Sequence, residues 1–331
     1  MREPGFWWRE PGLAGALLAP LGALYGAVAG ARMAREGTHA AAPVICVGNL
    51  TLGGSGKTPT AIAIAQLLMK LGERPFLLTR GYGGTQSGPL HVDLKRHHAR
   101  DVGDEALLLA RVAPTIVAHD RVLGAKIAHA SGATVIVMDD GLQNPSLHKT
   151  FSLAVIDGRR GLGNARVFPA GPLRAPLDQQ IARIHALLVI GEGAKDTAAA
   201  FTRGRRLPIF RARLEPETAK VESLRGQQIL AFAGIGDPEK FFATLAAAGI
   251  DAQHRRGFSD HHRYSAAEAQ SLLVQAEQEQ LRLLTTEKDH ARMAGDPALA
   301  ALAARAQTLP VALRLDDEAG FARLIRERIG K

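Results

Sequence analysis

The 331-residue chain contains one cysteine, Cys46, and aromatic side chains make up only 5% of it. A single cysteine excludes an intrachain disulfide and fits a reducing cytosolic compartment. The shortage of aromatic residues argues against surfaces that stack nucleic-acid bases. The sequence also lacks a long basic stripe, a nucleic-acid-binding motif, an internal repeat and a low-complexity tract. We therefore expect a globular protein that does not bind nucleic acid.

Positive charge is nevertheless in excess, and the formal net charge is +9. The basic residues are dispersed, with small groups at Lys95–Arg96 and around Arg205. A basic protein favours anionic partners. We rank an acidic membrane surface or a phosphorylated substrate above nucleic acid as the partner.

The N-terminal segment is unusually apolar. Residues 13–31 carry no charge, follow Trp7 and Trp8, and precede Arg32. A membrane-spanning helix needs about 20 apolar residues, and the tryptophans would suit the headgroup level. We therefore predict that residues 1–36 form a membrane-associating segment whose helix lies in or dips into the membrane interface. An Ala-rich core helix of a soluble protein is the alternative, because periodicity does not separate the two.

Short apolar runs alternate with helical patterns through the first half of the chain. This alternation predicts βαβ units and a parallel sheet covered on both faces, and so a P-loop NTPase-type three-layer α/β/α core at 37–190. Loop chemistry follows the strand ends, which is the edge where open α/β sheets bind ligands. The expected strands are 43–47, 76–79, 115–117, 134–138, 153–156 and 186–190, and the expected helices are 59–71, 104–112 and 124–131.

The pattern loosens between residues 191 and 225, which we interpret as a linker with an extended strand at 208–214. It then restarts, which predicts a second, smaller α/β domain at 226–331. The expected strands of that domain are 228–233, 281–285 and 310–315, and its expected helices are 238–248, 266–278 and a final C-terminal helix.

A glycine-rich loop at 53–58 reads Gly-Gly-Ser-Gly-Lys-Thr and lies between an expected strand and an expected helix. Such glycines let backbone amides turn inward and cradle phosphate oxygens. Lys57 would reach the β- and γ-phosphates, and the hydroxyl of Thr58 would ligate Mg²⁺. The general P-loop pattern has glycine where this chain has Thr51. We predict that the ATP-binding residues are Thr51, Leu52, Gly53, Gly54, Ser55, Gly56, Lys57 and Thr58.

Two acidic pairs are candidates for the metal side of this site. Asp139 and Asp140 follow an apolar strand, as in the Walker B arrangement that holds Mg²⁺ directly or through water. Strands also end in Asp as a turn signal, so the upstream loop is what favours the metal interpretation. Asp104 and Glu105 begin an expected helix, where acidic residues also simply stabilise the helix dipole.

Three further segments carry polar groups in expected loops. The run Ser-Asp-His-His at 259–262 offers general bases or metal ligands, but no second Cys/His cluster supports zinc. Arg174 follows Gly-Pro-Leu and could grip a phosphate or be a solvated charge. The run Thr-Glu-Lys-Asp at 286–289 lacks the Asn-Lys-x-Asp order of a guanine-specificity motif.

Taken together, these segments resemble the tetraacyldisaccharide 4′-kinase (lipid A 4′-kinase) family, and they occur in the family's order across nearly the whole chain. The apolar, Trp-containing N-terminus also matches. Thr51 agrees with the family, whereas Asn144 stands where the family has His. The matching segments are Val-Gly-Asn-Leu-Thr-Leu-Gly-Gly-Ser-Gly-Lys-Thr-Pro at 47–59, Thr-Arg-Gly-Tyr-Gly at 79–83, Val-Gly-Asp-Glu at 102–105, Met-Asp-Asp-Gly-Leu-Gln at 138–143, Gly-Pro-Leu-Arg at 171–174, Phe-Ser-Asp-His-His at 258–262 and Thr-Glu-Lys-Asp at 286–289.

The resemblance implies an ATP- and Mg²⁺-dependent kinase at the cytoplasmic face of the bacterial inner membrane. Its acceptor would be the 4′-hydroxyl of a tetraacylated glucosamine disaccharide 1-phosphate. By position, Asp104 resembles the acceptor-activating base paired with His261, and Lys57 and Arg174 resemble phosphate or transition-state contacts. The implied metal ligands are Thr58, Glu105, Asp139 and Asp140, and the implied substrate contacts are Asn49, Arg80, Tyr82 and Gln143.

Two other activities share the loop. A membrane-associated P-loop ATPase switch without a lipid acceptor would carry a second lysine early in the loop, where this chain has Leu52 and Gly53. A GTPase would carry the Asn-Lys-x-Asp motif that is absent here.

Overall fold

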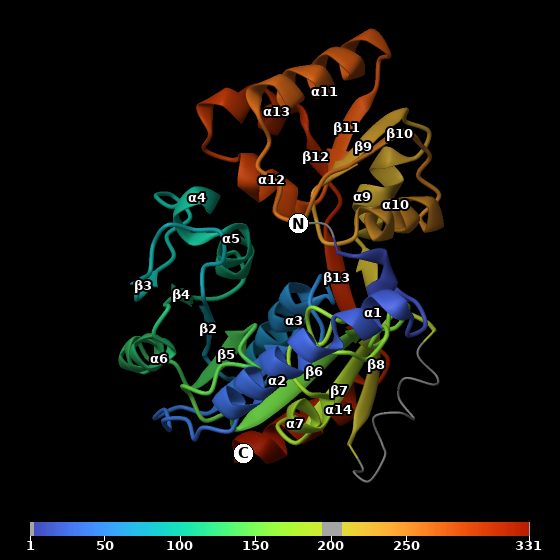
Figure 1. The fold of residues 1–331 in the computed structure, drawn as a ribbon. Helices are drawn as coiled ribbons and strands as arrows, with labels where there is room; N and C mark the ends of the chain where they lie inside the picture. Colours follow the sequence, from blue (N-terminus) through green and yellow to red (C-terminus); the bar gives the residue numbers. More distant parts are fainter. Residues whose placement is uncertain (1–2, 194–206, 331) are drawn as a thin grey trace.

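A computed structural model describes residues 3–193 and 207–330 of the chain. A nine-stranded sheet forms a large domain, and a four-stranded sheet forms a small domain beside it (Figure 1). This confirms the predicted α/β fold with a second, smaller α/β domain. Residues 194–206 of the predicted linker lie outside the described residues.

The large sheet has the order β13-β8-β7-β6-β1-β5-β2-β4-β3. Its strands pair in parallel except at the two edges, where β13 and β3 run antiparallel to their neighbours. Successive residues of β1 face opposite cores, with Ile45 and Val47 on one side and Val44 and Cys46 on the other. The strands are β1 (Val44–Gly48), β2 (Pro75–Thr79), β3 (Leu90–His91), β4 (Thr115–Val117), β5 (Val135–Asp139), β6 (Phe151–Asp157), β7 (Ala186–Ile190), β8 (Ile209–Pro216) and β13 (Val311–Leu315).

Helices cover both faces of this sheet, so the predicted three-layer arrangement is confirmed (Figure 1). One core is closed by apolar side chains such as Ile64, Leu109 and Phe321, and the other by small ones such as Ala125 and Ala128. The first face carries α3 (Lys57–Lys70), α5 (Asp104–Ala110) and α14 (Glu318–Ile329); the second carries α6 (Arg121–Ala130) and α7 (Leu177–Ile181). The short helix α4 (Ala99–Val102) precedes α5.

The small domain is a parallel sheet of order β10-β9-β11-β12, also covered on both faces. Its strands are β9 (Ile229–Ala233), β10 (Ala252–Gly257), β11 (Arg282–Thr285) and β12 (Gln307–Thr308). One face packs against α9 (Thr218–Leu224) and α10 (Pro238–Ala247). The other packs against α11 (Ala266–Gln278), α12 (Glu287–Met293), η2 (Pro297–Leu299) and α13 (Ala300–Arg305).

The predicted extent of the small domain, 226–331, is wrong at its C-terminal end. Strand β13 pairs with β8, and both belong to the large sheet. Phe321 and Ile325 of α14 pack into the core of the large domain. The strand expected within the linker is β8 itself, which pairs in parallel with β7. Apolar periodicity predicts that a strand exists but not which strand it pairs with.

The apolar N-terminal segment forms η1 (Gly5–Trp8), α1 (Leu13–Leu17) and α2 (Ala19–Met33). The chain breaks the helix at Leu18, just before Pro20 in the first turn of α2. Glycines make up most of the buried face of α2, and a methyl group at Gly22 would lie 2.8 Å from the carbonyl of Val167. Small residues therefore let this helix lie directly against the large domain.

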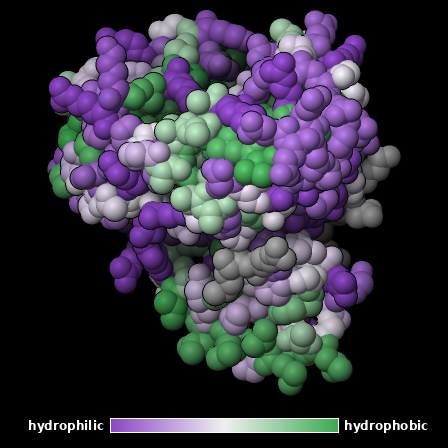
Figure 2. Space-filling model, turned by 90° about the horizontal axis from the view of Figure 1, so that it is seen from above, coloured by the Kyte–Doolittle hydropathy of each residue, from purple (hydrophilic) through white to green (hydrophobic). Residues whose placement is uncertain are grey.

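The opposite face of α1 and α2 is apolar and exposed. We call this the N-terminal apolar face; its residues are Leu13, Leu17, Leu21, Leu24, Tyr25 and Val28, which are 43–85% exposed. Figure 2 shows apolar side chains gathered at the lower edge of the view, the side on which Figure 1 has α1 and α2 in front. Among residues 3–193 and 207–330, no helix is long and apolar enough to cross a membrane.

Candidate active site

The glycine-rich loop leaves the carboxyl end of β1, between β5 and β6 in the large sheet, and leads into α3. Gly53 has a φ of 95° and Gly56 a φ of 90°, a left-handed backbone that favours glycine. Gly56 is the N-cap residue of α3, which begins at Lys57. The loop thus presents backbone amides and the positive end of α3 at the ligand-binding edge of the sheet.

Three charged groups meet beside the loop. Arg174 Nη1 donates to Asp140 Oδ1 at 2.8 Å, and Lys57 Nζ lies 3.8 Å from Asp140 Oδ2. Arg174 Nε also donates to the carbonyl of Thr51 at 3.0 Å, which ties the loop to the strand end of β5. Burial alone would raise the pKa of Asp140, but Lys57 and Arg174 hold it below its ordinary value. Asp140 is therefore an anion between two cations.

Asp139 has different surroundings from its neighbour. It is 1% exposed, and neither carboxylate oxygen has a hydrogen-bond partner among the described residues. Burial, with the nearby charges of Glu105 and Asp140, raises the pKa of Asp139 to about 7. Buried carboxylates without partners are costly, and oxygen ligands are those that Mg²⁺ prefers. Within residues 3–193 and 207–330, however, no group of three or more His, Cys, Asp or Glu side chains is arranged to hold a metal ion, so the ligand set of Thr58, Glu105, Asp139 and Asp140 stays a prediction.

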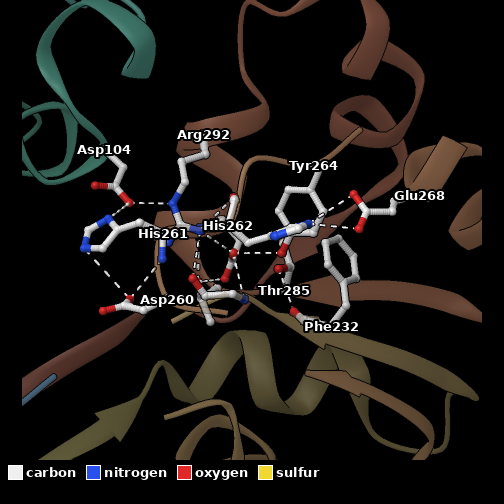
Figure 3. Close-up of polar contacts among 12 residues, drawn as sticks. Asp104, Phe232, Asp260, His261, His262, Tyr264, Glu268, Thr285 and Arg292 are labelled. Atoms are coloured by element: carbon white, nitrogen blue, oxygen red, sulfur yellow. Dashed lines mark hydrogen bonds and ion pairs between the residues drawn. The ribbon is translucent and has the colours of Figure 1, made fainter. Parts of the chain in front are cut away.

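The second acidic pair begins α5 and faces the small domain. Asp104 is 2% exposed, and its Oδ2 lies 2.6 Å from Arg292 Nε and 3.6 Å from His261 Nδ1 (Figure 3). Its other oxygen accepts from the backbone amide of Glu105 at 2.9 Å. Burial opposes ionisation, but the bond with His261 and the charges of Lys288 and Arg292 hold the pKa of Asp104 well below its usual range.

His261 and His262 lie next to each other but point in different directions (Figure 3). His261 has a φ of 52°, and its ring lies 4.8 Å from that of Tyr82 in the large domain. Burial lowers its pKa, but the pairing with Asp104 outweighs this and raises it. His262 instead bonds Glu268 at 3.0 Å and stacks on Phe258. Of these two histidines, only His261 therefore faces the cavity between the two domains.

A cavity of about 1270 Å³ lies between the two domains and unites these groups. The large domain contributes the glycine-rich loop and the end of β5, and the small domain contributes the loop before α10, His261 and the start of α12. The packing is close, since a methyl group at Gly236 would lie 3.0 Å from the amide nitrogen of Gly54. The predicted residues that line the cavity are Leu52, Gly53, Gly54, Ser55, Gly56, Lys57, Thr58, Arg80, Tyr82, Glu105, Asp140, Gln143, Arg174 and His261.

Asn49 was predicted to contact the substrate. In the structure its side chain is fully buried instead, and its Nδ2 donates to the carbonyl of Gly53 at 3.2 Å. It therefore braces the loop from beneath. Gln143 lines the cavity and donates to the carbonyl of Asn49 at 2.8 Å, so the two residues form one support.

Three cations at the site were not assigned roles from the sequence. Arg121, at the start of α6, is 2% exposed, lines the cavity and donates to the carbonyl of Ala118. Burial lowers its pKa to about 10. Its position after the end of β4 is the signal that would have located it, because strand ends share one edge. Lys288 and Arg292 come from α12; Lys288 belongs to the motif 286–289, and Arg292 lies one turn further along the helix.

The chain is similar in sequence and in structure to known proteins. The family described as Tetraacyldisaccharide-1-P 4′-kinase matches residues 14–330. The Tetraacyldisaccharide 4′-kinase of Methylobacterium sp. (strain 4-46) is 54% identical, over 100% of both proteins. That of Rhodopseudomonas palustris (strain BisA53) is 54% identical, over 100% of this chain and 96% of the relative. A crystal structure of "apo" form LpxK from Aquifex aeolicus in complex with ATP matches with a TM-score of 0.74 and 26% identity, over 96% of this chain and 100% of the other.

Proposed function

The chain belongs to the tetraacyldisaccharide-1-P 4′-kinase family, and from that premise we propose that it phosphorylates the 4′-hydroxyl of a tetraacylated glucosamine disaccharide 1-phosphate. The product is the 1,4′-bisphosphate precursor of lipid A. One observation carries the proposal: Lys57 of the loop and His261 of the small domain line the same cavity. A phosphate-binding loop facing a proton acceptor is what transfer to a hydroxyl requires.

ATP is the proposed phosphoryl donor. The structural neighbour from Aquifex aeolicus is described in complex with ATP, and the loop at 53–58 has the backbone geometry that cradles phosphates. Lys57 would neutralise the transferred phosphoryl group, and Arg174 would do so from the opposite side of Asp140. Phosphoryl transfer depends mainly on such positioning and charge neutralisation.

Thr58, Glu105, Asp139 and Asp140 would hold Mg²⁺. The unpartnered oxygens of Asp139 and the buried hydroxyl of Thr58 support this assignment. When bound, the ion supplies charge neutralisation to the phosphate oxygens.

The acceptor hydroxyl needs a group that takes its proton. His261 lines the cavity, whereas Asp104 lies behind it and is 2% exposed. We therefore assign the base to the Asp104–His261 pair, in which Asp104 orients the imidazole and stabilises its charged form. Tyr82 packs on the ring and would fix its direction. Because His261 comes from the small domain, the base is in place only when the domains lie together.

The acylated substrate suggests a membrane-seated enzyme. The N-terminal apolar face is exposed, and Arg32 and Arg35 follow it in the chain. Such a surface suits peripheral or monotopic attachment, with basic residues toward anionic lipid at the cytoplasmic face of the inner membrane. Arg32, in the last turn of α2, lines the cavity, so the cavity reaches the helix that carries this face. The substrate would therefore enter from the membrane side.

Transfer of radiolabelled γ-phosphate to the disaccharide 1-phosphate lipid tests the proposal. We expect labelled bisphosphate lipid with wild-type protein and none with Lys57→Ala. The rival function is a membrane-associated ATPase switch, which would hydrolyse ATP without the lipid at a rate that the lipid leaves unchanged. That result would overturn the kinase assignment while retaining the nucleotide site.

A further inference from the structure

Residues 164–174 lie between the N-terminal segment and the glycine-rich loop, and we call them the bridging loop. The amide of Leu173 donates to the carbonyl of Arg166 at 3.0 Å, which closes the bridging loop on itself. The side chain of Asn164 is 5% exposed and braces the loop from within, because its Nδ2 donates to the carbonyl of Ala170 at 2.9 Å. A loop that is closed and braced in this way transmits a displacement rather than absorbing it.

The C-terminal end of the bridging loop pairs with the chain that leads into the glycine-rich loop. The amide of Arg174 donates to the carbonyl of Leu50 at 2.9 Å, and the amide of Leu52 donates to the carbonyl of Pro172 at 2.7 Å. The side chain of Arg174 adds a third bond, from Nε to the carbonyl of Thr51 at 3.0 Å. Three hydrogen bonds therefore fix Arg174 and the start of the glycine-rich loop to one another.

The other side of the bridging loop contacts the N-terminal segment through Trp7. This side chain is 5% exposed, and its Nε1 donates to the carbonyl of Pro169 at 3.1 Å. Its ring packs edge-on against Phe168, and its backbone carbonyl accepts from the amide of Asn164 at 2.7 Å. Trp7 therefore points into the protein, whereas the sequence favoured a place at the level of lipid headgroups.

Helix α2 makes a second contact with the bridging loop. Gly22 is buried, and a methyl group there would lie 2.8 Å from the carbonyl of Val167, which is too close. One turn further along α2, a methyl group at Gly26 would lie in ordinary contact, 3.4 Å from the ring of Pro176 and 3.5 Å from the side chain of Val167. The two glycines thus offer a disruptive and a tolerated position on the same buried face.

We propose that the buried face of the N-terminal segment positions the glycine-rich loop and Arg174 through the bridging loop, with Trp7 as a positioning residue. The segment is then a structural part of the nucleotide site as well as the proposed membrane anchor. The inference rests on the proposed function only for the part that Arg174 plays in phosphate transfer. Phosphate contacts depend on exact placement, so a displacement that begins at Trp7 or Gly22 weakens them.

ATP affinity, measured by titration calorimetry on the full chain in detergent without the lipid acceptor, tests the connection. We expect Trp7→Ala and Gly22→Ala each to raise the Kd for ATP about fivefold or more, because they displace the bridging loop at different points. Trp7→Phe keeps a ring against Phe168 and should lie between Trp7→Ala and wild type. Alanine favours a helix more than glycine does, so the effect of Gly22→Ala does not come from loss of α2. Should Trp7→Ala fail to fold, Gly22→Ala decides, and an unchanged Kd in a folded alanine variant overturns the proposal.

Two matched controls separate this effect from membrane attachment. Gly26→Ala should change the Kd for ATP less than about twofold. Serine at Leu21, Leu24 and Val28 together alters only exposed positions, so it should weaken binding to anionic vesicles but also change the Kd for ATP less than about twofold. Trp7→Ala should show the reverse and bind such vesicles as wild type does. A loss of ATP affinity in the triple serine variant equal to that of the buried-face variants would overturn the proposal.

Hydrogen exchange locates the change within the molecule. Gly22→Ala should speed exchange at the amides of Leu52 and Arg174, which join the two loops, and leave the amides of α11 in the small domain as in wild type. Faster exchange in α11 as well would mean general destabilisation and would contradict a positioning role.

Kinetics with the lipid acceptor adds a second distinction. Gly22→Ala should lower kcat about fivefold or more with little change in the KM for the lipid, whereas the triple serine variant should mainly raise that KM. The calorimetry and the exchange need no lipid, so a failure of the proposed function would leave both results standing. A fall in kcat of equal size in the two proteins would contradict the inference.

Discussion

Oδ2 of Asp104 lies between two side chains of the small domain, 2.6 Å from Arg292 Nε and 3.6 Å from His261 Nδ1. Asp104 itself belongs to α5 of the large domain. One oxygen atom of Asp104 thus contacts both His261, its partner in the proposed general base, and Arg292, which belongs to the contact between the domains. The proposed proton acceptor and the contact between the domains therefore share this carboxylate.

We expect Asp104→Asn to lower kcat by about 10²–10⁴ while the KM for ATP changes less than about threefold. The amide no longer orients or stabilises the charged imidazole, but the nucleotide loop is intact. Steady-state kinetics with the lipid acceptor measures both constants. Asp251→Asn, at an exposed position, is the control and should behave as wild type. A change confined to the KM for ATP would refute the assigned role.

Lys57→Ala should abolish phosphate transfer and weaken ATP binding. The ammonium neutralises phosphate charge, and its loss also leaves Asp140 with Arg174 as the remaining close cation in the described structure. Phosphoryl transfer and nucleotide titration calorimetry measure the two effects. Lys70→Ala removes a lysine that pairs with Glu318 on the surface and should have no effect. Retained turnover in Lys57→Ala would refute the phosphate-binding assignment.

The local motifs predicted the loop after β1, Asp139 and Asp140 at the end of β5, and Asp104 and Glu105 at the start of a helix, which is where the structure has them. A strand followed by Gly53–Gly54 or by Asp139–Asp140 determines its own local geometry, and parallel strands bring such ends together. Most strands and helices were predictable for the same reason, because periodicity is a local property.

Long-range contacts were not predictable in this way. The pairing of β13 with β8 joins segments separated by the whole small domain. The contact of Lys288 with Glu105 likewise depends on how two domains pack. Asn49 was predicted to contact the substrate, and its burial was missed because a motif does not show which of its side chains are buried. The break at Leu18 shortened a helix that composition alone made nearly long enough to span a membrane.

The N-terminal apolar face should control attachment to vesicles that contain anionic lipid. Each of Leu21, Leu24 and Val28 is more than half exposed, so serine there removes apolar contact without disturbing the core. At roughly 1 kcal/mol for each side chain, the triple variant should bind such vesicles about a hundredfold more weakly. Vesicle co-sedimentation measures this. Leu123→Ser, at an exposed position on α6, is the matched control. Unchanged sedimentation of the triple variant would exclude this face as the anchor.

Lys240 of α10 forms an ion pair with Asp157 at the end of β6, with Nζ 2.8 Å from Oδ2. This ion pair should make the free energy of unfolding depend on pH. Burial opposes ionisation of Asp157, but Lys240 holds its pKa below the ordinary value of 3.8. A depressed acid pKa means that the unfolded chain binds the proton more tightly, so the bridge stabilises the fold fully above pH 3.8 and loses this effect as pH falls through the lower, folded pKa. Lys240→Met should therefore reduce the free energy of unfolding by about 1–3 kcal/mol at neutral pH and by less near pH 3. Urea unfolding of both proteins at the two pH values measures the difference. A deficit of equal size at both would show that Lys240 stabilises the protein through packing of its aliphatic stem rather than through the ion pair.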